Sequence, residues 1–269
     1  MKLFLIAIVG GTLAAQNMTV APGNWRQAGI SLVSSSDPAF AGLAPALVPP
    51  SAPNLAPTFP YSFVLRNGTG KAIIALGVRW TCTDAAGHVR THDRAWINQI
   101  TPTSSGTVAA GADRLVTPIL SPGTDASAIA SELAKFQAQQ SVSVSLEAVV
   151  LSDGTALGTD ANNTIPRVQA RLDAQKQVLT GITAAWQQGG AGAVTGYLQG
   201  IVVAAPPPHG DMAAVKAPTP SAAYAMGLSD MQRQLASGLL KRASSDPGAV
   251  AGFAQRLLAT RNYPNIQHQ

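Results

Sequence analysis

Residues 61–97 read YSFVLRNGTGKAIIALGVRWTCTDAAGHVRTHDRAWI, and the fold expected for the first half of the chain is built outward from them. From Ile74 onward, apolar residues occur at every second position: Ile74, Leu76, Val78, Trp80, Cys82. A period of two places these side chains on one face of a half-buried strand, whereas a helix repeats every three or four residues. The segment is therefore predicted to be a β-strand.

Turn residues on both sides of this strand predict two more strands. Upstream, apolar side chains alternate over residues 61–65, and Asn67-Gly68 suits a tight turn. Downstream, residues 84–87 make a four-residue turn that begins with Asp and ends with Gly, after which residues 89–97 can return alongside. The three strands are predicted to form one antiparallel meander.

Further patterns place the meander in a larger β-domain. Ser34 to Pro60 contains seven prolines and is expected to be a long surface loop or an extended edge segment. Alternation or turn signals predict more strands at 25–33, 107–120, 141–151 and 155–157, and a short amphipathic helix at 127–140. About seven strands with one inserted helix are typical of an antiparallel β-sandwich, which we predict for residues 16–160.

A resemblance accompanies this prediction. The segment FVLRNGTGKAIIALGVRW, residues 63–80, resembles bacterial sandwich modules of the immunoglobulin or fibronectin kind, a similarity of pattern over about a third of the chain. The resemblance implies a fold and no function. Cys82 is the only cysteine, so no intramolecular disulfide can form, and an antibody-type domain is not expected. Cys82 itself is predicted to be a buried apolar residue.

The pattern changes after Asp160. Pro166 is expected to open a helix whose apolar side chains recur at spacings of four and three, interrupted only by Gln175 and ended by Gly189-Gly190. This helical segment, 161–203, is followed by a proline-rich linker at 204–219 and by C-terminal helices at 220–269, which Thr219-Pro220 and Asp246-Pro247 begin. The predicted fold class is α+β, a sandwich followed by amphipathic helices.

The first fifteen residues indicate export. One lysine precedes an apolar run that ends in small residues, which suits a signal peptide over residues 1–15 cleaved near Ala14 or Ala15. An uncleaved anchor or a buried first strand are the alternatives. No later apolar run is long enough to cross a membrane. We therefore expect a secreted or periplasmic protein without a transmembrane span after cleavage.

The charge pattern limits the classes of partner. The formal charge is +5, and removing Lys2 with the signal peptide leaves +5 − 1 = +4, spread without any Lys/Arg run. Nucleic acid is therefore not an expected partner, because binding it requires a concentrated basic surface. Another protein or a surface polymer is expected instead, and a homo-oligomer is possible.

One group of basic residues is a candidate site. If residues 84–87 form the turn, an outward face is shared by Arg79, His88, Arg90, His92, Arg94. Such a patch could attract an anionic polymer or the carboxylates of a partner. The alternative is an ordinary solvated sheet face.

Metal and cofactor sites are not expected. His88, His92 and Asp93 could share zinc on a helix, but on a strand the two histidines lie about 13 Å apart. A second polar group could suggest a calcium loop but does not follow the EF-hand order: Asp153, Thr155, Asp160, Asn162. A hairpin end explains it equally well.

Motifs of known enzyme classes are missing, so a non-catalytic binding or interaction module is expected. The two glutamates are Glu132, on the predicted short helix, and Glu147, on an exposed strand face, with nothing to bring them together. A triad using His92 or His209 can form only in space and stays open. A secreted hydrolase of glycan, peptide or ester is thus one alternative, and a structural subunit of an envelope or filament assembly is a weaker one.

Overall fold

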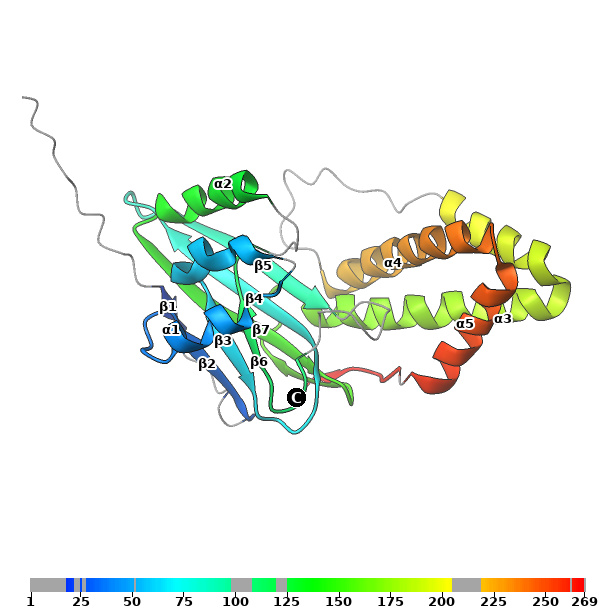
Figure 1. Ribbon diagram of the computed structural model, residues 1–269, viewed down its shortest axis with the longest axis horizontal. Coiled ribbons are helices and arrows are strands. Elements are labelled where there is room, and N and C mark those ends of the chain that lie inside the picture. Colours follow the sequence, from blue (N-terminus) through cyan, green and yellow to red (C-terminus); the bar gives the residue numbers. More distant parts are fainter. Residues whose placement is uncertain are drawn as a thin grey trace, which may run out of the picture. The chain divides into compact units, whose positions relative to one another are not determined.

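A computed structural model describes residues 18–21, 25, 28–50, 52–97, 108–119, 125–204, 219–261 and 263–268, without the side chains of 96 and 97. The predicted signal peptide, almost all of the proline-rich linker, and His209 lie outside these residues. The elements of the described chain, shown in Figure 1, are β1 (Thr19–Val20), β2 (Ile30–Ser34), α1 (Phe40–Leu43), η2 (Pro45–Leu47), η3 (Pro53–Tyr61), β3 (Phe63–Asn67), β4 (Ile73–Thr83), β5 (Val89–Ile97), β6 (Asp113–Val116), α2 (Ala126–Gln137), β7 (Ser141–Leu151), β8 (Thr155–Gly158), α3 (Thr164–Val203), α4 (Pro220–Ala243), α5 (Pro247–Thr260) and β9 (Gln267–His268).

The described residues form a mixed α+β structure with a helical C-terminal part, as the sequence predicts. Its nine strands lie in two sheets. One has the order β5-β4-β7-β8-β9, with β1 paired to β7, and the other has the order β2-β3-β6. The short strands β1 and β9 pair in parallel with β7 and β8, respectively, and no sequence pattern predicted either strand.

The predicted three-strand meander is wrong in its first connection. β3 pairs with β6, with Phe63 opposite Val116, and lies in a different sheet from β4. The reason is the side chain of Asn67, whose amide donates to the carbonyl oxygens of Lys71 at 2.8 Å and Val108 at 3.0 Å. These bonds build a wider loop that carries the chain from one sheet to the other in place of a two-residue hairpin.

The second connection is the hairpin that was expected. The backbone N–H of Asp84 donates to the carbonyl of His88 at 3.1 Å, and that of Gly87 donates to the carbonyl of Asp84 at 3.0 Å. Gly87 has a φ of 83°, a left-handed conformation that glycine adopts without steric cost. β4 and β5 are therefore neighbours in one sheet.

The chain divides into two compact units. The first comprises residues 1–66, 79–92 and 112–145, and the second comprises 67–78, 93–111 and 146–269. β4, β5 and β7 each contribute residues to both units along their length.

Aromatic side chains organise the core of the first unit. Trp80 is fully buried, its indole N–H donates to the carbonyl of Tyr61 at 3.0 Å, and its ring lies 6.5 Å from that of Phe63. Phe136 of α2 lies 5.3 Å from the ring of Tyr61. The predicted burial of Cys82 is confirmed, as is the helix over the 127–140 region.

The proline-rich segment 34–60 is more ordered than a surface loop. It folds into α1, η2 and η3, and the rings of Phe40 and Phe59 meet edge to face at 5.9 Å. Tyr61 ends η3 and does not belong to the strand predicted for it. Prolines suit this arrangement because a 3-10 turn fixes φ near the value that the ring imposes.

In the second unit, β7 is buried on both faces beyond Leu146. This corrects the expectation that Glu147 lies on an exposed face, since Glu147 is only 7% exposed. Its carboxylate accepts a hydrogen bond from the hydroxyl of Thr159 at 2.9 Å, and its carbonyl accepts from the N–H of Asp160 at 2.9 Å. The buried carboxylate is thus tied to the segment that leads into α3.

The first turns of α3 pack on the strands of this unit. Val168 and Leu172 share a buried apolar cluster with Ala75 of β4, Val150 of β7 and Ala156 of β8. The face of β4 that carries Ala75 and Gly77, expected to be the wetter one, is therefore covered.

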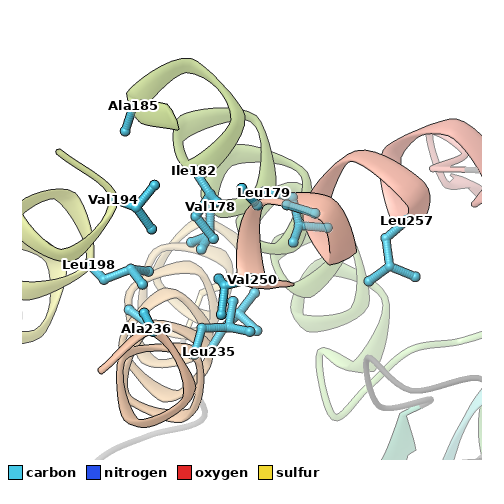
Figure 2. Close-up of a cluster of buried hydrophobic side chains, with 14 residues drawn as sticks. Val178, Leu179, Ile182, Ala185, Val194, Leu198, Leu235, Ala236, Val250 and Leu257 are labelled. Atoms are coloured by element: carbon cyan, nitrogen blue, oxygen red, sulfur yellow. The ribbon is translucent and has the colours of Figure 1, made fainter. Parts of the chain in front are cut away.

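Two glycines break α3, as the sequence predicts. Gly189 and Gly190 have non-helical backbone angles, and the helical segments lie on either side of them. Val178, Leu179 and Ile182 before the break share a core with Val194 and Leu198 after it. Leu235 and Ala236 of α4 and Val250 and Leu257 of α5 complete this core, as Figure 2 shows.

Local side-chain hydrogen bonds explain where α4 and α5 begin and how the segment after α5 is held. α4 begins at Thr219-Pro220 and α5 at Asp246-Pro247, and in each case the side chain before proline accepts a backbone N–H. After α5, the N–H of Ile266 donates to the side chain of Gln169 at 2.8 Å, which leads the chain to β9. None of the helices that the structure describes is long and apolar enough to cross a membrane.

Gly77 is predicted to be essential for the packing of α3. A Cβ at this position would lie 2.9 Å from the Oδ1 of Asn162 and still closer to the hydroxyl of Thr164. Gly77→Ala should therefore lower the free energy of unfolding by about 2 kcal/mol or more in urea titrations. Gly238→Ala in α4, where a Cβ meets nothing within 4 Å, is the matched control and should stabilise by about 0.5–1 kcal/mol. Equal effects of the two changes would contradict the packing described for Gly77.

Gln175, which interrupts the apolar stripe of α3, is predicted to destabilise the protein. It is 2% exposed, and its side-chain nitrogen finds no hydrogen-bond partner among the described residues. Gln175→Met removes this buried amide at similar volume, so the free energy of unfolding should rise by about 1 kcal/mol. Gln187→Met, at an exposed position of the same helix, should change it by less than about 0.5 kcal/mol. A loss of stability in Gln175→Met would show that the side-chain amide of Gln175 has a hydrogen-bond partner in solution.

Candidate functional site

The basic residues predicted as a patch lie on β4, on β5 and in the turn between them. In the first unit, His88 and Arg90 are exposed, and Arg79 and His92 are half-buried. The ring of His92 lies 5.1 Å from that of Phe136, so His92 is partly covered by α2. Arg94, in the second unit, is half-buried and donates to the carbonyl of Asp93 at 3.2 Å. A shared anion-binding role for the five residues stays a prediction.

The turn at residues 84–87 uses one of these residues for its own stability. The carboxylate of Asp84 accepts from the backbone N–H of His88 at 2.9 Å and lies 3.0 Å from the Nδ1 of His88. These contacts lower the pKa of Asp84 below its usual value. His88 therefore contributes to the hairpin end as well as to the basic surface.

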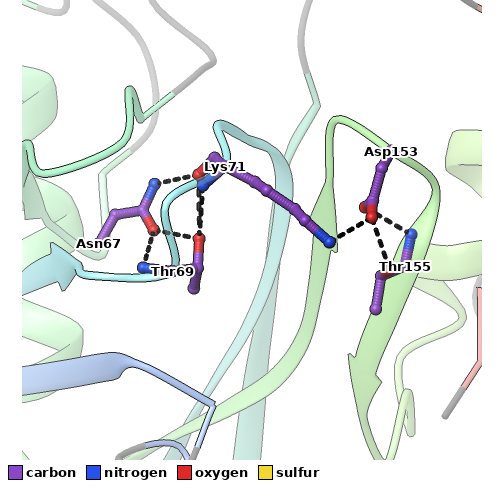
Figure 3. A network of polar contacts seen from close by, with 5 residues as sticks. All are labelled: Asn67, Thr69, Lys71, Asp153 and Thr155. Carbon is purple, nitrogen blue, oxygen red and sulfur yellow. Dashed lines mark hydrogen bonds and ion pairs between the residues drawn. The ribbon is translucent and has the colours of Figure 1, made fainter.

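The residues considered for calcium serve as turn and helix contacts. The carboxylate of Asp153 binds the ammonium group of Lys71 and accepts from the hydroxyl and N–H of Thr155, as Figure 3 shows. The same figure shows how Asn67 and Thr69 hold the loop that positions Lys71.

Asp160 is part of the start of α3. Its carboxylate accepts the N–H of Ile165 at 3.1 Å and 3.2 Å, and burial raises its pKa, although that bond and others oppose the shift. The hydroxyl of Thr164 donates to Asn162 at 2.8 Å. Among the described residues, no three His, Cys, Asp or Glu side chains gather as a metal site would require.

The two glutamates are engaged in separate local contacts. Glu132 pairs with Lys135 on α2, in the first unit, and Glu147 accepts from Thr159 in the second. The histidine considered for a triad on β5, His92, contacts Phe136.

The most distinctive polar arrangement lies between α3 and α4, within the second unit. A cavity of about 300 Å³ opens there, and Arg167 and Arg171 of α3 line one side of it. Asp230 and Gln234 of α4 line the other side. In each pair the residues are four positions apart, so the two side chains lie on one face of their helix.

Within the described chain, two carboxylates act on these arginines only at a distance, Asp160 on Arg167 and Asp230 on Arg171. Neither guanidinium group donates a hydrogen bond or lies within ion-pair distance of a carboxylate among the residues that the structure describes. Burial lowers the pKa of Arg171, the charge of Arg167 lowers it further, and Asp230 acts in the opposite direction. Two half-buried cations with unused donors favour an anion in the cavity, since a guanidinium offers five N–H donors in a planar fork.

Small residues let the two helices approach each other at this cavity. A Cβ on Gly227 would lie 3.2 Å from the Cβ of Ala170 and 3.6 Å from the Cα of Arg167. Ala223, Met226 and Met231 supply the apolar part of the lining. Next to the cavity, the hydroxyl of Tyr224 donates to Asp173 at 2.8 Å, which ties α4 to α3.

A second cavity, of about 390 Å³, lies between the later part of α3 and α4. Gly196 and Gly200 open its wall, and Tyr197 and Ile201 give it an apolar lining. Two of its polar side chains have partners, since Arg233 donates to the carbonyl of Ala204 at 3.2 Å and Gln232 donates to Gln177 at 2.7 Å. Its lining holds one arginine, whereas the first cavity holds two.

The arginine-lined cavity was missed by the sequence analysis. The only available signal was the four-residue spacing of Arg167 and Arg171 beside the apolar stripe of α3. Which helix lies opposite cannot be read from that spacing, and a proline-rich linker separates α3 from α4 in the sequence.

Comparison with known proteins gives no relative. No protein-family model, curated protein or solved structure matches this chain.

Asp153 is predicted to make stability depend on acid pH. The hydrogen bond from Lys71, followed by that from the N–H of Thr155, lowers the pKa of Asp153 from 3.8 to about 2. A carboxyl whose pKa is lower in the folded protein stabilises it above the unfolded pKa, and the effect disappears as pH falls through the folded pKa. Between pH 4 and 2 the wild-type chain should therefore lose stability more steeply than Asp153→Asn, as measured by urea titration at each pH. Parallel curves would contradict this assignment.

Proposed function

We propose that this protein is an exported, non-catalytic binding module of the bacterial envelope or secretome that holds an anionic group of its partner between α3 and α4. The observation that carries the proposal is the pair of half-buried guanidinium groups, Arg167 and Arg171, which donate no hydrogen bond to any residue that the structure describes and line a cavity of about 300 Å³. Leaving such groups without a partner costs stability, and sites of that kind are commonly retained for binding.

The proposed export of the protein rests on the first fifteen residues, whose charge and apolar run suit a signal peptide. The partner class rests on charge, because a thinly spread positive charge favours a protein or a surface polymer with carboxylates over nucleic acid. The basic residues of β5 are a second surface that the same partner could contact, since Arg90 is exposed.

We propose further that the two sheets belong to a sandwich of the immunoglobulin or fibronectin kind. Support comes from the first unit, where Phe63 of one sheet lies against Trp80 of the other. The parallel pairing of β1 with β7 and of β9 with β8 departs from the purely antiparallel sheets of such modules.

Arg171→Gln is predicted to remove stabilisation by anions. In thermal unfolding at equal ionic strength, replacing chloride by acetate or sulfate should raise the Tm of the wild-type chain by about 3–6 °C at ten times Kd, because binding to the folded state adds to its stability. Arg171→Gln should keep only the general effect of these salts on protein surfaces, and it should fold normally because it loses no internal hydrogen bond.

Arg256→Gln is the matched control, since Arg256 is an exposed arginine of α5. It should retain the full wild-type response to each anion. If wild type, Arg171→Gln and Arg256→Gln respond alike, anion binding between α3 and α4 is excluded and the proposal fails.

A further inference from the structure

The cavity between α3 and α4 combines cationic, acidic and apolar groups, and this combination restricts what it can hold. The chemistry inferred for the bound group rests on the proposed binding function. Among the side chains that line the cavity, Arg167 and Arg171 contribute +2 and Asp230 contributes −1, a sum of +2 − 1 = +1, while Asp160 acts on Arg167 from outside the lining. A single carboxylate matches this charge, whereas a phosphate dianion would leave an excess negative charge next to Asp230.

Asp230 argues against a site that binds only simple anions, because its negative charge repels a bound anion. On α4, Asp230 can accept a hydrogen bond, and Gln234, one turn later, can both donate and accept. A peptide group offers one N–H donor and one carbonyl acceptor. The α4 side of the cavity therefore has the polar groups that a peptide bond requires.

The remaining lining is apolar and adaptable. Met226, Met231 and Ala223 present no charge, and methionine side chains adjust to the shape of an apolar group. Gly227 lies close to Ala170 and Arg167 of α3, where a Cβ would lie 3.2 Å from the Cβ of Ala170. A volume of about 300 Å³ lies at the small end of ligand sites, so the bound group is short.

We infer that this cavity binds the C-terminal residue of a partner protein, one that ends in an apolar side chain. The free carboxylate lies between the guanidinium groups of Arg167 and Arg171, and the last peptide N–H donates to Asp230. The apolar side chain of that residue contacts Met226 and Met231. Capture of a chain end by paired donors is a recurrent mode of peptide recognition.

The test uses the full chain and the tripeptide N-acetyl-alanyl-alanyl-leucine, supplied with a free C-terminal carboxylate and as its C-terminal amide. Isothermal titration calorimetry compares both peptides with hexanoate and inorganic phosphate at equal ionic strength. The free acid should bind saturably, and the amide should bind at least about 10-fold more weakly because its end carries no charge. Arg171→Gln and Arg167→Gln should each lower the affinity for the free acid about 10-fold or more, and Arg256→Gln should leave it unchanged.

Asp230→Asn separates peptide recognition from simple binding of a carboxylate. This change should weaken binding of the tripeptide acid. The affinity for hexanoate should stay the same or increase, because hexanoate offers no N–H to position 230. Circular dichroism of every variant checks that the helices are intact.

Each outcome distinguishes the inference from the function on which it rests. Equal binding of acid and amide shows that no charge is recognised and overturns both. Tighter binding of phosphate than of the acid overturns the C-terminal inference and leaves anion binding in place. Binding of hexanoate and the acid with equal affinity, unaffected by Asp230→Asn, also overturns it in favour of a small free carboxylate. No saturable binding of any of the four probes overturns both.

Discussion

The second unit depends on one close approach, that of Gly77 on β4 to the start of α3. A side chain at position 77 would overlap Thr164 and Asn162, so the two segments can meet only because glycine has no Cβ. The polar residues at this junction satisfy one another, since Thr164 donates to Asn162, and the carboxylate of Asp160 caps the N–H of Ile165. The bond from Ile165 to Asp160 pairs one N–H of the first turn of α3 and helps to define where the helix starts.

The location of the cavity follows from this junction. Arg167 lies one turn after Thr164, and Val168 next to it is buried against β4, β7 and β8, which fixes the side of α3 on which Arg167 and Arg171 emerge. α4 then comes close enough to complete the cavity because Gly227 lies against Ala170. The core shared with α5 holds both helices further along their length. The shape of the cavity thus rests on packing in a segment rich in small residues, where the position of a helix is set by close contact of backbones.

Local patterns predicted the elements well and their pairing less well. The alternation in β4 and β7, the stripe of α2, the Gly189-Gly190 break, and the proline starts of α4 and α5 are all signals carried by neighbouring residues. β3 was placed beside β4 because Asn67-Gly68 suits a hairpin, but the amide of Asn67 bonds to the distant carbonyl of Val108. Glu147 was placed on an exposed face because alternation cannot show which further segment covers it. The cavity that Arg167 and Arg171 line is completed by residues of another helix, and no local pattern contains that information.

The central claim is that the start of α3 and the strands beneath it form one cooperative unit that holds the arginines in place. Native-state hydrogen exchange measures this most directly, by comparing the amide of Ile165, bonded to Asp160, with the amides of Val149 and Val150 in β7. The account predicts that these amides exchange with the same opening free energy and the same dependence on denaturant. Exchange at Ile165 through a separate opening of much lower free energy, with β7 still protected, would show that α3 is held independently of the sheet and would contradict the account.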